Sequence, residues 1–571
     1  MSGEPRLKVV LCWHMHQPQY RDLIRDSYQL PWTYLHGIKD YVDMAAHLEA
    51  VPAARAVVNF APVLLEQIED YARQVRAHLE NGAQIRDPLL AALAGPDGPS
   101  GSEARADLIA ACLRANPNRL IGRFPAYQRL VELAHCLGDI SAGVEYASDQ
   151  YLADLLVWYH LAWTGETVRR QDTRIKRLEN KATGYTLADR RQLLGVIGEQ
   201  LSGLIGRYRV LAERGQVELA VSPYAHPILP LLLELGCARE ALPDVPLPML
   251  EGYPGGRDRA RWHVRAAIEC FERHFGMLPK GCWPSEGGVS QATLKLLEEH
   301  GFQWTASGQG VLANSCNRRS GAATDPEGAY TVHQPYRLKD GRIACFFRDD
   351  GLSDLIGFTY SDWHADDAVA NLVHHLEAIA GASRERPNAV VSIVLDGENA
   401  WEYYPENGYH FLSALYRRLA EHPQLELTTF SAALAGSGPP AELPRLVAGS
   451  WVYGTFSTWI GDPDKNRGWD MLGAAKRTYD AAFASGQLSD EQCAKALEQL
   501  AICEGSDWFW WFGDYNPADT VRDFDSLYRR HLSALYRFLG KEPPSYLDQP
   551  FTHGGGAPRA GGTMRPGQAQ S

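Results

Sequence analysis

The sequence predicts an α/β fold of the (β/α) barrel type, with a helical insertion and an α-helical region after it. Short runs rich in β-branched and aromatic residues recur along the chain, and most are separated by amphipathic helical patterns. The polar residues able to carry chemistry stand immediately after these runs. This alternation is typical of a parallel sheet, and in a barrel the C-terminal ends of the strands carry the active site.

Eight runs are expected to be strands, and seven or eight is the number of a barrel. They cover residues 9–13, 56–61, 217–221, 281–283, 303–306, 342–347, 389–395 and 425–429. Helical patterns between them include residues 266–275, 291–300 and 368–379. The residues that follow the runs, and that we expect at one face of the barrel, are His14, His16, Asn59, His226, Glu286, Asp396 and Glu398.

The domain plan follows from where the β-rich runs are missing. Residues 62–215 show none but contain amphipathic patterns at 151–163 and 188–212. We therefore expect a barrel domain over 1–435, with a helical insertion at about 62–215 that walls one side of the cleft. Helical patterns predict a second domain over 445–550, and the Gly-rich residues 551–571 are expected to form a disordered tail.

The composition excludes several classes of function. The chain has 56 Lys and Arg against 69 Asp and Glu, a net charge of -13, which opposes binding to nucleic acid or an anionic membrane. None of the ten cysteines forms a CxxC pair, and no run of 18 apolar residues or secretion signal occurs. We expect a cytoplasmic protein with reduced thiols. Its 15 Trp and 26 Tyr offer the flat faces that suit sugar rings.

Isolated carboxylates beside tryptophan suggest an acid and base pair. Glu286 follows Trp283 by three residues, and Asp396 and Glu398 precede Trp401 at the end of an apolar run. Glycosidic bond cleavage needs one carboxyl group to protonate the leaving oxygen and another to attack or stabilise the sugar carbon. Glu286 with either Asp396 or Glu398 could supply them, whereas a lone acid at a strand end is more often a helix cap.

His14, His16 and His226 allow two chemical interpretations. Alternate residues of a strand face the same side, so His14 and His16 could point into one pocket. They could bind a metal, but candidate partners such as Asp354 follow no metal-specific spacing. Hydrogen bonds to sugar hydroxyls are the preferred interpretation, and no metal or other cofactor is expected. The segment from Asp462 lacks the Gly and Glu of a calcium loop.

The aromatic run from Glu504 to Asp514 also has two interpretations. Such a run, which includes Trp510, usually packs into a core. Glu504 and Asp507, however, lie one helical turn apart and could reach the cleft together.

Five blocks in order, His14–Pro18, 215–232, 282–288, 395–402 and 504–513, resemble glycoside hydrolase family 57, the retaining α-glucan enzymes. The resemblance covers nearly all of residues 7–540. It implies an incomplete seven-stranded (β/α) barrel and a helical domain that completes the active site. It also implies that Glu286 is the nucleophile and Asp396 the general acid/base. The residues expected to bind or support substrate are His14, His16, His226, Trp283, Asp354, Glu398, Trp401, Asp507 and Trp510.

The first and fourth blocks are more similar to amylopullulanase and α-amylase members than to branching enzymes. We therefore expect a retaining hydrolase of α-1,4 and possibly α-1,6 glucan bonds, acting on glycogen, starch, maltodextrin or pullulan. Two alternatives use other chemistry or another acceptor: a 4-α-glucanotransferase or glycogen branching enzyme with the same catalytic pair, and a zinc-dependent polysaccharide deacetylase or mannosidase. A glucan-binding protein without catalysis is a third. The sequence does not indicate the oligomeric state.

Overall fold

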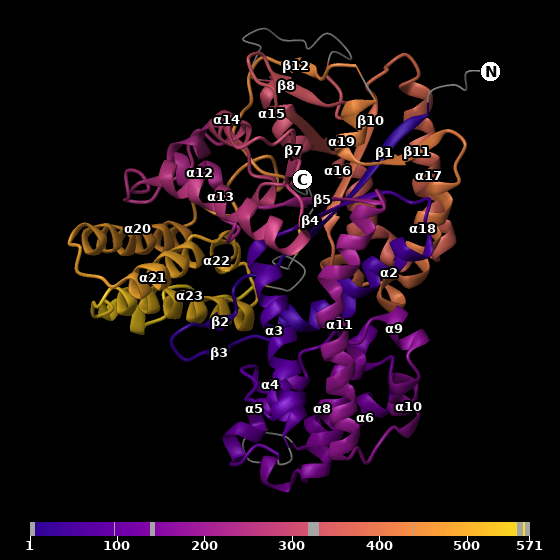
Figure 1. The fold of residues 1–571 in the computed structure, drawn as a ribbon, viewed down its shortest axis with the longest axis vertical. Coiled ribbons are helices and arrows are strands. Elements are labelled where there is room, and N and C mark those ends of the chain that lie inside the picture. Colours follow the sequence, from indigo (N-terminus) through magenta and orange to yellow (C-terminus); the bar gives the residue numbers. More distant parts are fainter. Residues whose placement is uncertain are drawn as a thin grey trace.

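The computed structural model describes residues 6–95, 98–137, 143–317, 330–436, 438–556 and 564–565. Its centre is a barrel of seven parallel strands (Figure 1). These are β1 (Leu7–Met15), β4 (Ala56–Phe60), β5 (Val217–Val221), β6 (Gly281–Cys282), β7 (Trp304–Gly308), β9 (Ala344–Arg348) and β10 (Val390–Asp396). The predicted (β/α) barrel with seven strands is confirmed.

The strand order is β10, β1, β4, β5, β6, β7, β9, and the ring closes where Ser392 of β10 pairs with Arg348 of β9. The eighth predicted run is also a strand, β11 (Leu425–Thr428), which pairs with the first half of β1. Two short strands that the sequence did not reveal, β8 (Tyr336–Leu338) and β12 (Ala441–Leu443), extend the sheet beyond β9.

Side chains fill the inside of the barrel. Val10 and Cys12 of β1, together with Ala220, Phe346 and Val394 from other strands, form a buried cluster there. This packing explains why the strands read as continuous apolar runs, since both of their faces are covered.

Three aromatic rings meet within the same cluster. Phe430, on α19 (Phe430–Ala435), packs its ring 4.5 Å from that of Trp304 and 4.4 Å from that of Phe346, measured between centroids. Gly281 is required beside them, since a Cβ there would lie 1.8 Å from the Trp304 indole.

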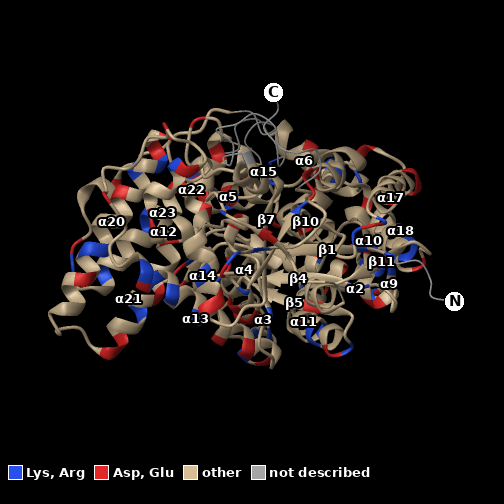
Figure 2. Ribbon diagram, turned by 90° about the horizontal axis from the view of Figure 1, so that it is seen from above, with Lys and Arg blue, Asp and Glu red and all other residues tan. Residues whose placement is uncertain are grey.

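Helices surround the barrel and cover its outer surface. They are α1 (Trp32–His36), α2 (Val42–Ala50), α12 (Leu229–Leu233), α13 (Gly256–Phe275), α14 (Gln291–Glu299), α15 (Gln309–Asn317), α16 (Asp350–Asp354), α17 (Ala365–Ala382) and α18 (Tyr409–Ala420). In the view along the barrel, Lys, Arg, Asp and Glu are spread over the peripheral helices (Figure 2).

The predicted helical insertion is present and forms the lower lobe in Figure 1. Its helices are α3 (Pro62–Asn81), α4 (Pro88–Ala94), α5 (Ser102–Cys112), α6 (Pro125–Cys136), α8 (Asp149–Ala162), α9 (Glu166–Gln171), α10 (Thr173–Lys181) and α11 (Leu187–Glu213). Side chains cap the starts of α4, α8 and α11, because Asp87, Ser148 and Thr186 each accept a backbone N–H of the helix that follows.

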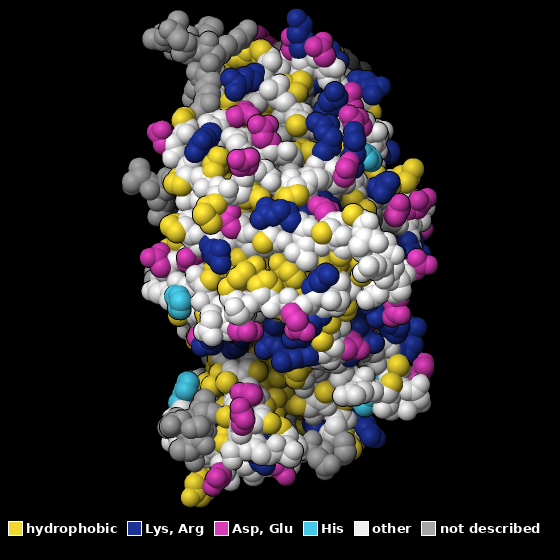
Figure 3. Space-filling view, turned by 90° about the vertical axis from the view of Figure 1, so that its left-hand side faces the viewer, with side chains coloured by type: hydrophobic (Ala, Val, Ile, Leu, Met, Phe, Trp, Pro, Cys, Tyr) yellow, Lys and Arg dark blue, Asp and Glu magenta, His cyan; other side chains and the backbone are white. Residues whose placement is uncertain are grey.

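The helical region after the barrel contains α20 (Pro463–Ala484), α21 (Asp490–Cys503), α22 (Ser506–Trp511) and α23 (Ala518–Phe538). Figure 3 shows the side of the molecule on which these helices lie, and both signs of charge are interspersed there. Buried Glu504 joins this region to the barrel: its carboxylate accepts from the Arg259 guanidinium and from His263 Nε2 at 2.7 Å, both on α13. The exact domain boundaries stay a prediction, and most of the predicted disordered tail, residues 557–563 and 566–571, lies outside the described residues.

Candidate active site

The C-terminal ends of the barrel strands meet at one face, as the pattern of polar residues predicts. β1 ends in His14 and Met15, β4 carries Asn59, and Asp396 is the last residue of β10. His14 and Asp396 are direct neighbours in the β1–β10 register, and His14 neighbours Asn59 on the other side. Glu286 follows β6 by four residues. Parallel pairing therefore gathers side chains from four distant parts of the chain.

Glu286 is held in a tight turn. It lies in the short helix Ser285–Gly287 with a φ of 58°, in the left-handed region that residues with a Cβ rarely adopt. Trp451 fixes the residue twice: its backbone N–H donates to the Glu286 carbonyl at 3.1 Å, and its indole Nε1 donates to Glu286 Oε2 at 3.0 Å. Oε1 lies 4.0 Å from His226 Nδ1 and does not take part in the hydrogen bonds with Trp451. Strained backbone held in this way is typical of functional sites.

Asp396 is positioned by its own strand and by the turn after it. Asn399 Nδ2 donates to Asp396 Oδ2 at 2.9 Å, and Gly397 N–H donates to the His14 carbonyl at 2.7 Å. A Cβ at position 397 would lie 2.1 Å from the sulfur of Met15, so the close passage of the chain requires glycine there.

The two carboxyl groups are near enough for the charge of Asp396 to act on Glu286. Burial and, second, the charge of Asp396 raise the pKa of Glu286 to about 8, against the donation from Trp451, which lowers it. Burial likewise raises the pKa of Asp396 to about 6, with Asn399, His16 and Arg348 acting in the opposite direction. Between these two pH values the pair therefore carries one proton and one negative charge. In the empty cleft that proton resides mainly on Glu286.

Glu398 lies behind the pair. It is 3% exposed, accepts from Gln17 Nε2 at 3.3 Å through Oε1, and its Oε2 has no partner among the described residues. Burial, then Asp396 and Asp40, raise the pKa of its carboxyl group. Glu398 is therefore ionised less readily than an exposed glutamate.

The three predicted histidines lie together beside Glu286. Asn59 Oδ1 accepts from His14 Nδ1 at 2.7 Å and from Ser222 Oγ at 2.9 Å, so the His14 proton is on Nδ1. His226 Nε2 then donates to His14 Nε2 at 3.0 Å, and the Ser506 hydroxyl donates to His226 Nδ1 at 2.9 Å. Burial is the main reason that the pKa of His14 falls to about 3 and that of His226 falls well below its ordinary value. Both rings are neutral, in fixed tautomers.

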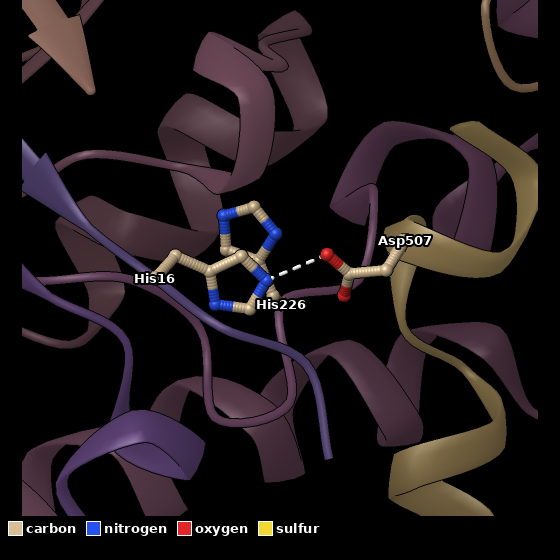
Figure 4. Close-up of side chains that lie close together, drawn as sticks. All are labelled: His16, His226 and Asp507. Atoms are coloured by element: carbon tan, nitrogen blue, oxygen red, sulfur yellow. Dashed lines mark hydrogen bonds and ion pairs between the residues drawn. The ribbon is translucent and has the colours of Figure 1, made fainter. Parts of the chain in front are cut away.

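Among the described residues, His16, His226 and Asp507 form a group that could hold a metal ion, since one ligand atom of each lies within 4.8 Å of the others (Figure 4). His16 Nε2, however, donates to Asp507 Oδ1 at 2.8 Å, and the two imidazoles stack with 3.7 Å between centroids and 19° between planes. An imidazole binds a metal in the plane of its ring, so two stacked rings cannot both point at one ion. The arrangement fits hydrogen bonding better than metal binding.

The remaining predicted site residues fall in two groups. Asp354 accepts from Arg348 Nη2 at 2.7 Å, and Arg348 faces Asp396 across the cleft, whose wall also includes Trp510. Trp283 and Trp401 are fully buried: Trp283 packs against Trp451 at 5.1 Å, and Trp401 donates its Nε1 to the Gly397 carbonyl at 3.0 Å. Their rings offer no open face to a sugar and instead support the residues around the carboxyl pair.

Four residues with contacts in the site were not singled out from the sequence as site residues: Trp451, Arg348, Asn399 and Ser506. Asn399 stands three residues after Asp396, and its amide close to a strand-end acid was the one local signal available. The contacts of Trp451 and Ser506 join segments 165 and 280 residues apart, which no short pattern reveals.

Comparison with known proteins identifies the family. The model of the family described as glycosyl hydrolase family 57 matches residues 10–444, which is most of the chain. The chain belongs to glycosyl hydrolase family 57. The family 57 resemblance inferred from the five sequence blocks is thus confirmed, and the enzyme is of the glycoside hydrolase type.

This family 57 chain is similar to the 1,4-alpha-glucan branching enzyme TK1436 of Thermococcus kodakarensis, with 23% identity over 406 residues. That match covers 59% of this chain and 56% of the relative, so it spans little more than half of the relative's length.

Two solved structures share the fold of the family 57 chain. One is a branching enzyme from Pyrococcus horikoshii, with a TM-score of 0.57, 16% identity and coverage of 96% of this chain and 92% of the other. The other is the α-amylase AmyC from Thermotoga maritima, with a TM-score of 0.54, 14% identity and coverage of 94% and 93%. Within the described part of this chain, no helix is both long and apolar enough to cross a bilayer.

Proposed function

We propose that this family 57 enzyme cleaves α-glucan chains by double displacement with retention of configuration. Glu286 acts as the nucleophile and Asp396 as the general acid/base. The observation that carries the proposal is the pair itself: two carboxyl groups at separate strand ends, Glu286 held by Trp451 and Asp396 held by Asn399, near enough for the charge of Asp396 to act on Glu286. Glycosidic cleavage requires one ionised and one protonated carboxyl group; near neutral pH the pair has this total charge, but with the proton on Glu286.

The first step starts from ionised Glu286 and protonated Asp396. Substrate binding therefore has to move the shared proton from Glu286 to Asp396. Glu286 Oε1 then attacks the anomeric carbon while the glycosidic C–O bond breaks, and the Asp396 proton passes to the leaving oxygen. Trp451 favours this state because it donates to Oε2 and leaves Oε1 free to react.

In the second step Asp396, now ionised, takes a proton from the acceptor hydroxyl. The acceptor oxygen attacks the same carbon, and the ester bond to Glu286 breaks. Two inversions return the original configuration. The neutral imidazoles of His14 and His226 remain as hydrogen-bonding groups beside the reacting sugar, with no change of charge during the cycle.

For the acceptor, we propose a sugar hydroxyl of a second α-glucan chain in preference to water. The cleft beside Asp396 is walled by Phe358, Trp451 and Trp510, and such flat apolar surfaces bind sugar rings and exclude water. The similarity to a protein named as a branching enzyme supports transfer. Hydrolysis of the amylase or amylopullulanase kind is the second candidate, supported by the fold shared with AmyC.

Product analysis tests the acceptor. Incubation with maltoheptaose and with amylose should yield chains longer than the starting material or new α-1,6 branches, with little free reducing sugar. Release of short sugars in proportion to time, with no longer or branched product, would favour hydrolysis instead. If no α-glucan gives either of these two results, the proposed function as a whole is wrong.

Chemical rescue by azide tests the roles of the two acids separately. With Glu286→Gly, azide attacks an α-linked activated substrate directly, and one inversion gives a β-glycosyl azide. With Asp396→Gly, the ester to Glu286 still forms, and its displacement by azide gives the α product. If Glu286→Gly gave the α product and Asp396→Gly gave the β product, the roles of the two acids would be reversed.

Metal-dependent hydrolysis, as in a zinc deacetylase or mannosidase, predicts loss of activity in EDTA. The stacked arrangement of His16 and His226 argues against that chemistry. Activity that is unchanged by EDTA and by added Zn²⁺ is expected. A loss in EDTA that Zn²⁺ restores would support the metal-dependent alternative.

A further inference from the structure

The C-terminal segment reaches the candidate active site. Met564 and Arg565 line the same cleft as Asp396, between the strand-end residues and the helical region. The cleft wall beside them contains Arg348, Phe358, Trp451 and Trp510. With Met564 and Arg565 in place, the cavity volume is only about 20 Å³, room for about one water molecule. A glucose ring cannot enter while these two residues stay there.

Arg565 is seated on aromatic rings. Its guanidinium carbon lies 4.6 Å from the centroid of Trp510 and 5.0 Å from that of Tyr515, and Nη1 donates to Thr458 Oγ1 at 3.3 Å. Stacking of a guanidinium on an indole uses the same flat face that would receive a sugar ring. The positive charge also suits a pocket that contains Glu286 and Asp396, and Arg565 acts on the charge of Glu286 directly.

The start of the segment is fixed close to this position. Phe551 packs on Phe512 with 4.9 Å between centroids, and Gly555 and Gly556 each donate a backbone N–H to the Asn516 carbonyl at 3.1 Å. A Cβ at position 556 would lie 1.7 Å from the Tyr515 carbonyl oxygen, so this approach depends on glycine. The segment is thus attached to the loop that carries Tyr515, one of the rings under Arg565.

The contact of Arg565 is also incomplete. Its Nε and Nη2 atoms are buried without a hydrogen-bond partner among the described residues. Burying a donor without a partner costs about 1 to 3 kcal/mol, which offsets part of the gain from stacking. An occupant held in this way can be displaced by a ligand that satisfies the cleft better.

We propose that Met564 and Arg565 are an intramolecular competitor for the acceptor side of the catalytic cleft, so that an α-glucan chain must displace them before it can react. The inference rests on the proposed function, because it takes the glucan as the competing ligand. If these residues occupy the site for part of the time, the apparent dissociation constant of the substrate equals the intrinsic constant divided by the fraction of molecules whose cleft is open. It does not change the chemical step once substrate is bound.

The main test compares Arg565→Ala in the full-length chain with a chain that ends after Gly556. Both should lower KM for maltoheptaose at least three-fold and leave kcat within two-fold of the unmodified enzyme. Arg522→Ala is the matched control, since Arg522 is an exposed arginine of α23, 71% exposed at its side chain. The control should change neither constant.

A second test restores the segment from outside. A synthetic peptide with the sequence of residues 557–571 should inhibit the truncated enzyme competitively with maltoheptaose, and the same peptide with Ala in place of Arg565 should inhibit it at least three-fold more weakly. Equal KM values for the full-length, Arg565→Ala and truncated enzymes, or a loss of kcat on removal of Arg565, would overturn the inference. If no form of the enzyme converts any α-glucan, the proposed function is wrong. That result differs from equal KM values in active enzymes, which would contradict the inference alone.

Discussion

The indole of Trp451 donates to Glu286 Oε2 at 3.0 Å, while the backbone N–H of the same tryptophan donates to the Glu286 carbonyl at 3.1 Å. One residue thus fixes both the backbone and the carboxylate of the proposed nucleophile. Trp451 stands between β12 and α20, outside the barrel strands, so the segment after the barrel completes a site that the barrel begins.

Trp451→Phe tests this relationship. The substitution removes the indole donor, keeps an aromatic ring and leaves the backbone hydrogen bond in place. A hydrogen bond to a charged group contributes about 1.5 to 3 kcal/mol, so kcat should fall about ten- to hundred-fold with little change in KM. Steady-state kinetics on maltoheptaose measure both constants. Trp262→Phe, on α13, is the control and should leave kcat unchanged. A higher KM with a normal kcat would mean that Trp451 binds sugar and does not orient Glu286.

The pH dependence of the reaction should be bell-shaped. Below the pKa of about 6 for Asp396 both acids are protonated and no nucleophile is available, whereas above the pKa of about 8 for Glu286 both are ionised and no acid remains. Activity should therefore be highest between pH 6 and pH 8, with one limb on each side. The pH profile of kcat/KM measures this dependence, since this constant reports the ionisation of the free enzyme. In Asp396→Asn, assayed on a substrate whose leaving group needs no protonation, the basic limb should disappear.

Glu286→Gln should stabilise the folded protein, and more so as the pH rises. Burial raises the pKa of Glu286 from 4.5 to about 8, so its stabilising contribution is complete below pH 4.5 and is lost as the pH rises through 8. Glutamine does not ionise, so the variant does not lose this stability as the pH rises. At one pKa unit per 1.36 kcal/mol, the variant should gain about 2 to 4 kcal/mol at pH 8 relative to pH 4.5. Denaturant unfolding at the two pH values measures it, and an equal difference at both would contradict the shift.

Glu504→Gln should strongly destabilise the junction between the barrel and the helical region. Glu504 accepts from Arg259, from His263 and from the Tyr253 hydroxyl, and these partners hold its pKa at about 2 despite burial. Removing one charge of a buried pair costs about 3 to 5 kcal/mol because the other charge is left uncompensated. Chemical denaturation monitored by tryptophan fluorescence measures the loss. Glu491→Gln, on the exposed surface of α21, is the matched control and should show no change.

Local pattern in the sequence was sufficient to predict the barrel. Runs such as 389–395 are apolar on both faces, because Val390 and Val394 of β10 pack inside the barrel with Cys12 while helices cover the outside. Such a pattern can be recognised without knowing the partner strand. The end of the run then places Asp396 at the face where the other strands end. The short strands β8 and β12 were missed because three residues carry no periodic signal.

The geometry of the site could be predicted only in part. The sequence brought Glu286, Asp396 and the histidines to one face, but it left Asp396 and Glu398 as equal candidates until the family resemblance was considered. The structure separates them by position: Asp396 ends the strand, while Glu398 turns back towards Gln17. The tryptophans next in sequence to the acids, Trp283 and Trp401, are buried, whereas Trp451 contacts Glu286 across 165 residues. Proximity in the chain is therefore a poor guide to which indole touches an acid.

The first strand of the chain, β1, pairs with β10 and β11, which come near the end of the barrel sequence. Residues 8–14 of β1 take residues 390–396 as partners, and residues 7–10 also take 425–428. During synthesis the seam of the barrel cannot close until about residue 430 has left the ribosome, which at roughly 5 to 20 residues per second takes on the order of half a minute. Through that interval the edge of β1 that will pair with β10 is open, so we expect refolding in vitro to be slow and sensitive to protein concentration.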